Sequence, residues 1–277
     1  MHALPDIPGY ELLARLGGGP LADVFAARAL DSGTLRAIKV VRGNGPDADA
    51  AVLLARREAR ALRAVKSQHV VRLRDAHVGQ SPYYLVLDLL GGESLRERLT
   101  RDYALDHRTA LWIARQTATG LDAVHRAGFL HGDLKPDNVQ LDNGTAVLLD
   151  LGFARKPGAS SDGFLLGTAN YLAPELCGRE PAADFAADWY AFGVTLFEML
   201  VGRLPFATGS VAEAMERHRT EDARTALNEV ADQWPPRLAH LVDTLLHPHA
   251  GSRPRGQVVL RELIALEIGA LGVRRAG

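Results

Sequence analysis

HGDLKPDN, residues 131–138, is the most informative run in this sequence of 277 residues, and a short predicted strand separates it from DLG, residues 150–152. The run contains Lys135, one of only four lysines among the 32 basic residues of the chain. An ammonium group is a compact point charge, whereas a guanidinium is a planar fork of donors. A lysine in so arginine-rich a sequence therefore indicates a position where a point charge is needed.

The first ninety residues have the pattern of short strands and one helix. Turn-forming runs, GGGP at 17–20 and DSG at 31–33, separate the first three β-prone segments. A segment rich in Ala, Leu and Arg that ends near Val65 has the pattern of a helix. The predicted strands are residues 10–16, 23–28, 35–41, 70–76 and 83–89.

Lys39 is predicted to face Glu58. Alternate residues of a strand share a face, so Lys39 lies on the same side of its strand as Ala37. Glu58 falls on the apolar stripe of the helix that follows. A carboxylate on a buried face needs a cation, and Lys39 is the nearest candidate in the sequence.

Three glycines lie between the first two predicted strands, in LGGGPLADV at 16–24. Glycines allow backbone amides to approach a phosphate without obstruction by side chains. The same run is also typical of a plain hairpin, and the Gly-Lys-Ser/Thr of a Walker A loop does not follow it. Taken alone, the run leaves both interpretations open.

From residue 94 onward the pattern is mostly helical, with predicted helices at 106–126, 184–201, 235–247 and 254–268. The second of these is apolar nearly all round, as a helix inside a lobe would be. Gly91 and Gly92 mark the change of pattern, so a hinge is predicted at 88–92. The expected fold class is α+β with two lobes. Residues 1–90 would form a small β-rich lobe with one helix, and residues 91–277 a larger, mainly α-helical lobe.

Together these motifs resemble the protein kinase family. HGDLKPDN is similar to the catalytic loop of that family, and DLG to its metal-binding DFG motif. GTANYLAPE at 167–175, DWYAFG at 188–193 and Arg253 resemble, in the same order, the end of the activation segment, the buried anchoring helix and a late arginine. The resemblance covers residues 10 to 268. The DLKPxN pattern and Thr168 resemble Ser/Thr kinases, of bacterial type, rather than tyrosine kinases.

The resemblance implies a Mg²⁺-dependent transfer of the γ-phosphate of ATP to a Ser or Thr hydroxyl of a protein substrate. Asp133 would orient the hydroxyl and receive its proton, and Lys135 would neutralise the γ-phosphate. Lys39, held by Glu58, would bind the α- and β-phosphates. The implied magnesium ligands are Asn138 and Asp150. The implied lining of the ATP site, with Leu87 as gatekeeper, is Leu16, Gly17, Gly18, Gly19, Val24, Ala37, Lys39, Leu87, Asp88, Leu90 and Gln140.

Three further contacts are implied by the same resemblance. Glu175 and Arg253 would form a structural ion pair, and Asp188 would accept hydrogen bonds from amides of the catalytic loop. Thr168 would bond Asp133 and Lys135.

Four residues depart from the family pattern. They are Ala22 for a glycine, Leu151 for a phenylalanine, Gln140 for an apolar residue under adenine, and Gly132 for the arginine beside the catalytic aspartate. A buried Gln140 without a partner would weaken ATP binding. Gly132 carries no charge for a phosphate to neutralise. Activity is therefore expected without phosphorylation of the activation segment, whose hydroxyls are Ser160, Ser161 and Thr168, unless another arginine substitutes.

The amino-acid composition bears on the expected partners, disulfides and location of the protein. Apolar residues make up 47% and charged residues 23%, which is ordinary for a globular domain. The formal net charge of -1 gives no electrostatic reason to expect a nucleic acid or an anionic membrane as partner. The single cysteine, Cys177, excludes an internal disulfide. Without a long apolar run or a signal-like N-terminus, a cytoplasmic location is expected.

Two alternatives belong to other functional classes. A pseudokinase that binds nucleotide as a scaffold usually lacks Lys39, Asp133 or Asp150, all of which are present. A small-molecule phosphotransferase would not be expected to carry GTANYLAPE, which resembles the part of a kinase that shapes a groove for a peptide. The expected partners are ATP, a protein with a Ser or Thr acceptor, and a separate regulatory protein if the activation segment itself does not provide control.

Overall fold

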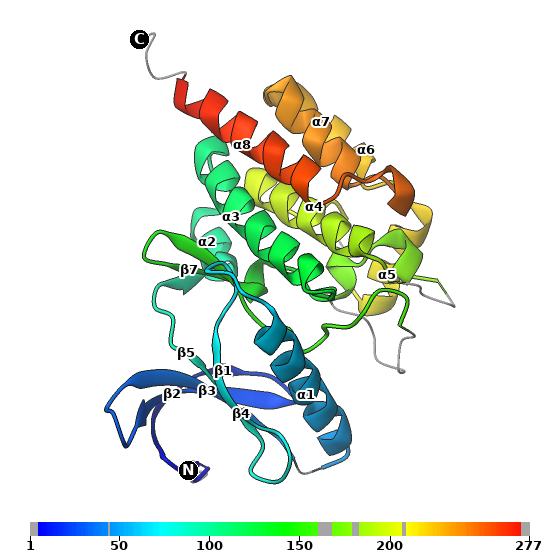
Figure 1. Ribbon diagram of the computed structural model, residues 1–277. Helices are drawn as coiled ribbons and strands as arrows, with labels where there is room; N and C mark the ends of the chain where they lie inside the picture. Colours follow the sequence, from blue (N-terminus) through cyan, green and yellow to red (C-terminus); the bar gives the residue numbers. More distant parts are fainter. Residues whose placement is uncertain (1–4, 44, 160–167, 179–182, 207–208, 273–277) are drawn as a thin grey trace.

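A five-stranded antiparallel sheet, with strand order β1-β2-β3-β5-β4, forms the N-terminal part of the molecule. The structure is a computed structural model that describes residues 5–43, 45–159, 168–178, 183–206 and 209–272. Figure 1 shows the sheet at one end of the molecule with the helix α1 beside it. The elements are β1 (Tyr10–Gly18), β2 (Ala22–Ala29), β3 (Leu35–Val41), α1 (Ala48–Ala64), β4 (Leu73–His77) and β5 (Tyr84–Asp88).

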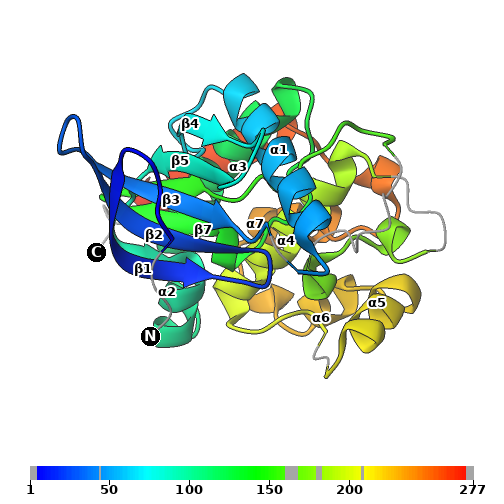
Figure 2. The same cartoon turned by 90° about the horizontal axis from the view of Figure 1, so that it is seen from below.

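The helix α1 packs against the sheet through one face, and Figure 2 shows the two from a second direction. Its buried residues recur every three or four positions and include Leu54, Ala55 and Leu62. Glu58 lies in the same stripe and is 1% exposed. The helical period therefore places a carboxylate at the interface between α1 and the sheet.

The rest of the chain is mostly helical. Its central helix, α4, is buried nearly all round and contributes the fully buried Trp189, Tyr190 and Phe192. The side chain of Asp184 accepts a hydrogen bond at the start of α4, and Gly202, in the left-handed conformation, ends it. The helices are α2 (Leu95–Asp102), α3 (His107–Arg126), α4 (Phe185–Val201), α5 (Val211–Thr220), α6 (Arg224–Asn228), α7 (Pro236–Leu245) and α8 (Gln257–Gly272). Short 3₁₀ helices span Pro136–Asn138, Ala169–Tyr171, Pro174–Leu176, Ala231–Gln233 and Ala250–Ser252.

A second, three-stranded sheet joins the two parts. It consists of β6 (Glu93–Ser94), β7 (Val139–Asp142) and β8 (Thr145–Leu148), in that order. Asn143 and Gly144 connect β7 to β8 with φ angles of 44° and 76°, as a type I′ hairpin turn requires. The backbone amide of Val71 donates to the Leu148 carbonyl at 2.9 Å, which ties β8 to the segment before β4.

The predicted two-lobed α+β fold is confirmed, and most predicted elements are found within a few residues. The predicted lobe boundary, at residues 90 and 91, falls between β5 and β6. Between Asn138 and Asp150 the sequence analysis predicted one short strand, whereas the structure has the β7–β8 hairpin. Within the described ranges, no helix is both long and apolar enough to cross a bilayer.

Candidate active site

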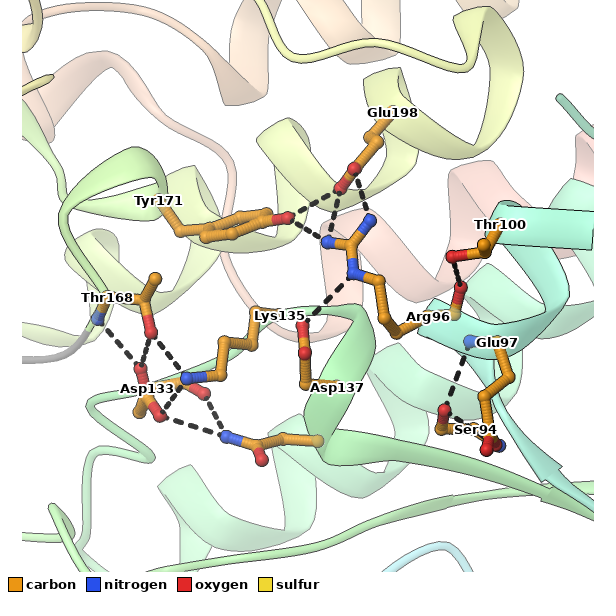
Figure 3. Close-up of polar contacts among 11 residues, drawn as sticks. Ser94, Arg96, Glu97, Thr100, Asp133, Lys135, Asp137, Thr168, Tyr171 and Glu198 are labelled. Carbon is orange, nitrogen blue, oxygen red and sulfur yellow. Dashed lines mark hydrogen bonds and ion pairs between the residues drawn. The ribbon is translucent and has the colours of Figure 1, made fainter. Parts of the chain in front are cut away.

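Asp133 and Lys135, two of the four predicted catalytic residues, form one hydrogen-bonded group with Thr168 (Figure 3). The hydroxyl and the backbone amide of Thr168 each donate to Asp133 Oδ1 at 2.8 Å. The ammonium of Lys135 lies 2.8 Å from Asp133 Oδ2 and also donates to the Thr168 hydroxyl. The Nδ2 of Asn138 donates to the same Oδ2 at 3.0 Å and to the Asp133 carbonyl at 2.7 Å. The predicted contacts of Thr168 with Asp133 and Lys135 are thus confirmed.

Asp188 of α4 fixes the start of this loop. Its carboxylate accepts hydrogen bonds from the amides of His131 at 2.8 Å and Gly132 at 2.9 Å, and it contacts the His125 ring at 2.8 Å. Asp188 is buried, and burial alone would raise its pKa. The hydrogen bonds from His125 and the loop amide outweigh burial and hold the pKa of Asp188 below its usual value. The predicted role of Asp188 as an acceptor for loop amides is confirmed.

Gly132 has a backbone conformation that other residues rarely adopt. Its φ is 79°, and a Cβ at this position would lie 2.8 Å from the Phe153 carbonyl oxygen. Glycine therefore suits both the left-handed backbone and the close approach of the next segment. An arginine here would have to overcome both constraints.

Another arginine does lie beside the catalytic loop. The Arg155 carbonyl accepts a hydrogen bond from Leu130 at 2.8 Å, and the residue is 9% exposed. Its Nε has no hydrogen-bond partner among the described residues, and burial lowers the pKa of Arg155. Arg155 is therefore the candidate for an arginine that takes the role of the family arginine replaced by Gly132. Ser160 and Ser161, the hydroxyls named above, lie outside the described residues.

Lys39 of β3 lies between two carboxylates. Its Nζ is 2.7 Å from Glu58 Oε2 and 3.0 Å from Asp150 Oδ1, which confirms the predicted pair with Glu58. Burial opposes the charge on Lys39, but Asp150 and Glu58 together raise its pKa above the usual value. Burial raises the pKa of Glu58 to about 7, against the influence of Lys39. The cluster holds two carboxylates and one cation, so an incoming cation would be attracted to it.

The predicted metal ligands offer oxygen atoms that suit Mg²⁺. Asp150 has a φ of 53°, which is unusual for a residue other than glycine, and its side chain is 39% exposed. Asn138 uses its Nδ2 to bond Asp133, and its Oδ1 makes no hydrogen bond within the described part of the chain. Mg²⁺ is usually held by one or two protein ligands together with substrate phosphates. Within the described ranges, no group of three His, Cys, Asp or Glu residues could hold a metal without such help.

Most of the predicted ATP-site residues lie on β1, β2, β3 and β5 of the five-stranded sheet or directly after these strands. Leu16, Gly17 and Gly18 end β1, Val24 is on β2, and Ala37 pairs with Leu87 in the β3–β5 register. Gly19 closes the turn, with its amide donating to the Ala22 carbonyl at 2.8 Å. Asp88 ends β5 with its side chain bonded to Arg74 at 2.6 Å, and Leu90 follows, half-buried.

Gln140 is not left without a partner. Its Nε2 donates to the Gly91 carbonyl at 2.7 Å, so the side chain ties β7 to the predicted hinge. The cost of burying a free amide, which the sequence analysis considered, does not apply to this donor.

An acidic side chain on β2 shapes the glycine run. Asp23 accepts hydrogen bonds from Arg15 at 2.8 Å and from Arg42 at 3.1 Å. A Cβ on Gly18 would lie 2.4 Å from Asp23 Oδ1 and 2.9 Å from the backbone carbonyl oxygen of Ala22, so glycine suits this close approach. The sequence analysis did not predict this contact.

Sequence analysis also missed a polar network next to the catalytic loop (Figure 3). Arg96 of α2 donates to Glu198 of α4 at 2.7 Å and to the Tyr171 hydroxyl at 2.6 Å, and its Nε lies 3.3 Å from Asp137. The Tyr171 hydroxyl in turn donates to Glu198 at 2.6 Å. The network links the segment after Thr168 to two helices. The start of α2 did have a sequence signal, because Ser94 and the residue three positions later form a capping box.

The ion pair that anchors the segment after Thr168 is confirmed. Arg253 donates to both oxygens of Glu175, at 2.7 and 2.8 Å, and its guanidinium lies over the Tyr190 ring. This pair holds residues 168–178 against α4. A site built in this way supplies positioning and charge with little covalent chemistry, which is what phosphoryl transfer requires of a protein.

Comparisons with known proteins agree with this class. Residues 10–263 match the family model described as protein kinase domain. The probable serine/threonine-protein kinase pknA2 of Bifidobacterium longum is 30% identical over 265 residues, which cover 93% of this chain and 35% of the relative. The serine/threonine-protein kinase pkn2 of Myxococcus xanthus is 33% identical, over 97% of this chain and 33% of the relative. For PkaB of Streptomyces coelicolor the identity is 36%, over 65% of this chain and 49% of the relative.

The chain therefore belongs to the protein kinase family, and its relatives include Ser/Thr protein kinases of bacteria. It spans about a third to a half of the length of these curated relatives.

Proposed function

We propose that this domain transfers the γ-phosphate of ATP to Ser and Thr hydroxyls of protein substrates, with Mg²⁺ as cofactor. The observation that carries the proposal is the contact of Asp133 with both Lys135 and Thr168. This contact brings a proton acceptor and a point charge together. They meet at the start of the segment that resembles the part of a kinase that shapes a groove for a peptide. The bacterial relatives, which are named as serine/threonine-protein kinases, support the same acceptor class.

Asp133 is the group that would receive the proton of the acceptor hydroxyl. Its Oδ1 is held by Thr168, and its Oδ2 by Lys135 and Asn138. These bonds fix the carboxylate, so little reorientation is needed during the reaction. As the hydroxyl oxygen bonds to phosphorus, its proton passes to Asp133 and the bond from phosphorus to the ADP oxygen breaks.

The two lysines would bind phosphate oxygens from different sides of the site. Glu58 holds Lys39 at 2.7 Å and keeps its ammonium directed toward Asp150. Lys135, next to Asp133, would neutralise charge on the transferred group. Mg²⁺, held by Asn138 and Asp150, would supply further neutralisation of phosphate charge.

The two alternatives have less support. In a nucleotide-binding scaffold without catalysis, the contacts around Asp133 would serve no reaction. A small-molecule phosphotransferase would not need the anchored segment that includes Thr168 and Glu175. We also propose a cytoplasmic location, which the requirement for ATP supports. A separate regulatory partner is part of the same proposal.

A labelling assay with a panel of acceptors tests the proposal. The purified domain is incubated with γ-labelled ATP, Mg²⁺ and either a generic mixed protein substrate, an amino sugar or an amino alcohol. We expect label on protein serine and threonine, and loss of transfer when EDTA removes the metal. Label on a small molecule alone would support the phosphotransferase alternative. ATP binding without transfer to any acceptor would support the scaffold.

A further inference from the structure

One face of α1 carries a row of arginines that the kinase site does not use. Arg56, Arg60 and Arg63 are spaced by four and three residues, so they lie on one side of the helix. All three are exposed, on the side away from the buried Glu58. Figure 1 shows α1 at the margin of the N-terminal part.

The row retains unsatisfied positive charge. Arg56 donates to the Val78 carbonyl at 2.9 Å, which links α1 to the loop between β4 and β5. Within the described part of the chain, neither Arg60 nor Arg63 forms an ion pair or a side-chain hydrogen bond, whereas most other arginines contact a carboxylate. An unpaired row of cations is a favourable place for carboxylates to bind.

The same residues line a hollow. Arg56, Arg60, Arg63, Ala64, Val78 and Gly79 border a shallow groove that is largely open to solvent. Val78 and Ala64 give part of its wall an apolar character. The groove therefore combines cations with a small apolar surface, a combination that suits a peptide carrying both acidic and aliphatic side chains.

We propose that this groove docks an extended acidic segment of a partner protein. From Arg56 to Arg63 the helix rises about 10 Å, which matches two or three carboxylates on alternate residues of an extended chain, about 7 Å apart. A nucleic acid fits less well, because none of the lining residues is aromatic for base stacking and the chain has a formal net charge of -1.

Fluorescence anisotropy with a labelled peptide of alternating glutamate and leucine tests the docking site. We expect saturable binding to the whole domain, which weakens as salt is raised because exposed ion pairs are screened. The variant Arg60→Glu/Arg63→Glu should bind at least about tenfold more weakly. Arg60→Gln/Arg63→Gln should show a smaller loss in the same direction, and circular dichroism should show that both variants are folded.

Matched controls distinguish this groove from a general charge effect. Arg108→Glu/Arg261→Glu changes the net charge equally at two exposed arginines of the helical part and should leave peptide binding unchanged. Equal loss in this control, or no saturable binding to the wild type at low salt, would overturn the proposal. Tighter binding of a labelled oligoribonucleotide than of the peptide, lost in Arg60→Glu/Arg63→Glu, would also overturn it in favour of a nucleic-acid site.

Discussion

Replacing Lys39 with methionine removes the ammonium that lies 2.7 Å from Glu58 and 3.0 Å from Asp150. Methionine keeps the length and apolar stem of the side chain but not its charge. Loss of one preorganised electrostatic contact lowers kcat by about 10²–10³, or about 3–4 kcal/mol. Because the change also frees two carboxylates to repel phosphate, we expect phosphotransfer to fall by about 10²–10⁴.

The same change should alter stability in a pH-dependent way. Glu58 is 1% exposed and its pKa is about 7 in the presence of Lys39. A carboxyl with a raised pKa binds more protons in the folded than in the unfolded state, so its ionisation lowers stability as pH rises. Without Lys39 the pKa of Glu58 rises further, so the loss of stability caused by its ionisation continues to higher pH. We expect Lys39→Met to be destabilised by about 3–5 kcal/mol near pH 8, and less near pH 6.

Initial rates and urea unfolding measure the two effects separately. Lys66→Met is the matched control, since Lys66 is exposed and should affect neither quantity. The double variant Lys39→Met/Glu58→Gln should regain much of the stability but none of the activity. Turnover in Lys39→Met equal to that of the wild type would refute the assigned role of Lys39.

The remaining predictions concern metal, nucleotide, control and pH. Asp150→Asn should lose most of the Mg²⁺-dependent rise in Tm with ATP, because an amide is a poorer ligand than a carboxylate; an equal rise in both proteins would contradict the metal role. Gln140→Leu should change ATP affinity by titration calorimetry by no more than about threefold, since a lost hydrogen bond to Gly91 is offset by an apolar surface; a loss above about tenfold would mean direct contact with ATP. Ser160→Ala/Ser161→Ala, shown by mass spectrometry to be unphosphorylated, should keep near wild-type rates, and a large drop would identify a phospho-switch, for which Arg155 is the candidate cation. Burial lowers the pKa of His218 from 6.5 to about 4, so the folded state binds its proton less readily than the unfolded state does. The free energy of unfolding should therefore fall as pH drops below 6.5, by about 2 kcal/mol at pH 5. His218→Gln should remove this pH dependence in urea titrations.

Periodic patterns and short motifs made part of the site predictable. Strand alternation placed Lys39 on the face of Ala37, and helical spacing placed Glu58 in a buried stripe, so their contact followed from two independent periods. The two-lobed fold was predictable for a similar reason, because strand and helix patterns segregate on either side of Gly91 and Gly92.

Contacts between exposed or distant residues were not predictable in the same way. Arg96 and Glu198 are 102 positions apart and belong to no shared pattern, so nothing in a chain with many arginines singles out this one. The bond of Gln140 to Gly91 depends on how β7 lies beside the hinge, which propensity does not determine. The β7–β8 hairpin was a different case, since Asn143-Gly144 is a strong local turn signal that the sequence analysis did not use.

Single-turnover transfer of labelled γ-phosphate to protein, measured for the wild type and for Asp133→Asn, tests the proposed phosphotransfer most directly. Asparagine keeps the shape of the side chain and its contact with Thr168, but it is not a proton acceptor. We predict transfer by the wild type and a rate lower by about 10²–10⁴ in the variant, with ATP binding retained. Equal rates in the two proteins, or a wild type that binds ATP and Mg²⁺ but transfers nothing, would contradict the account.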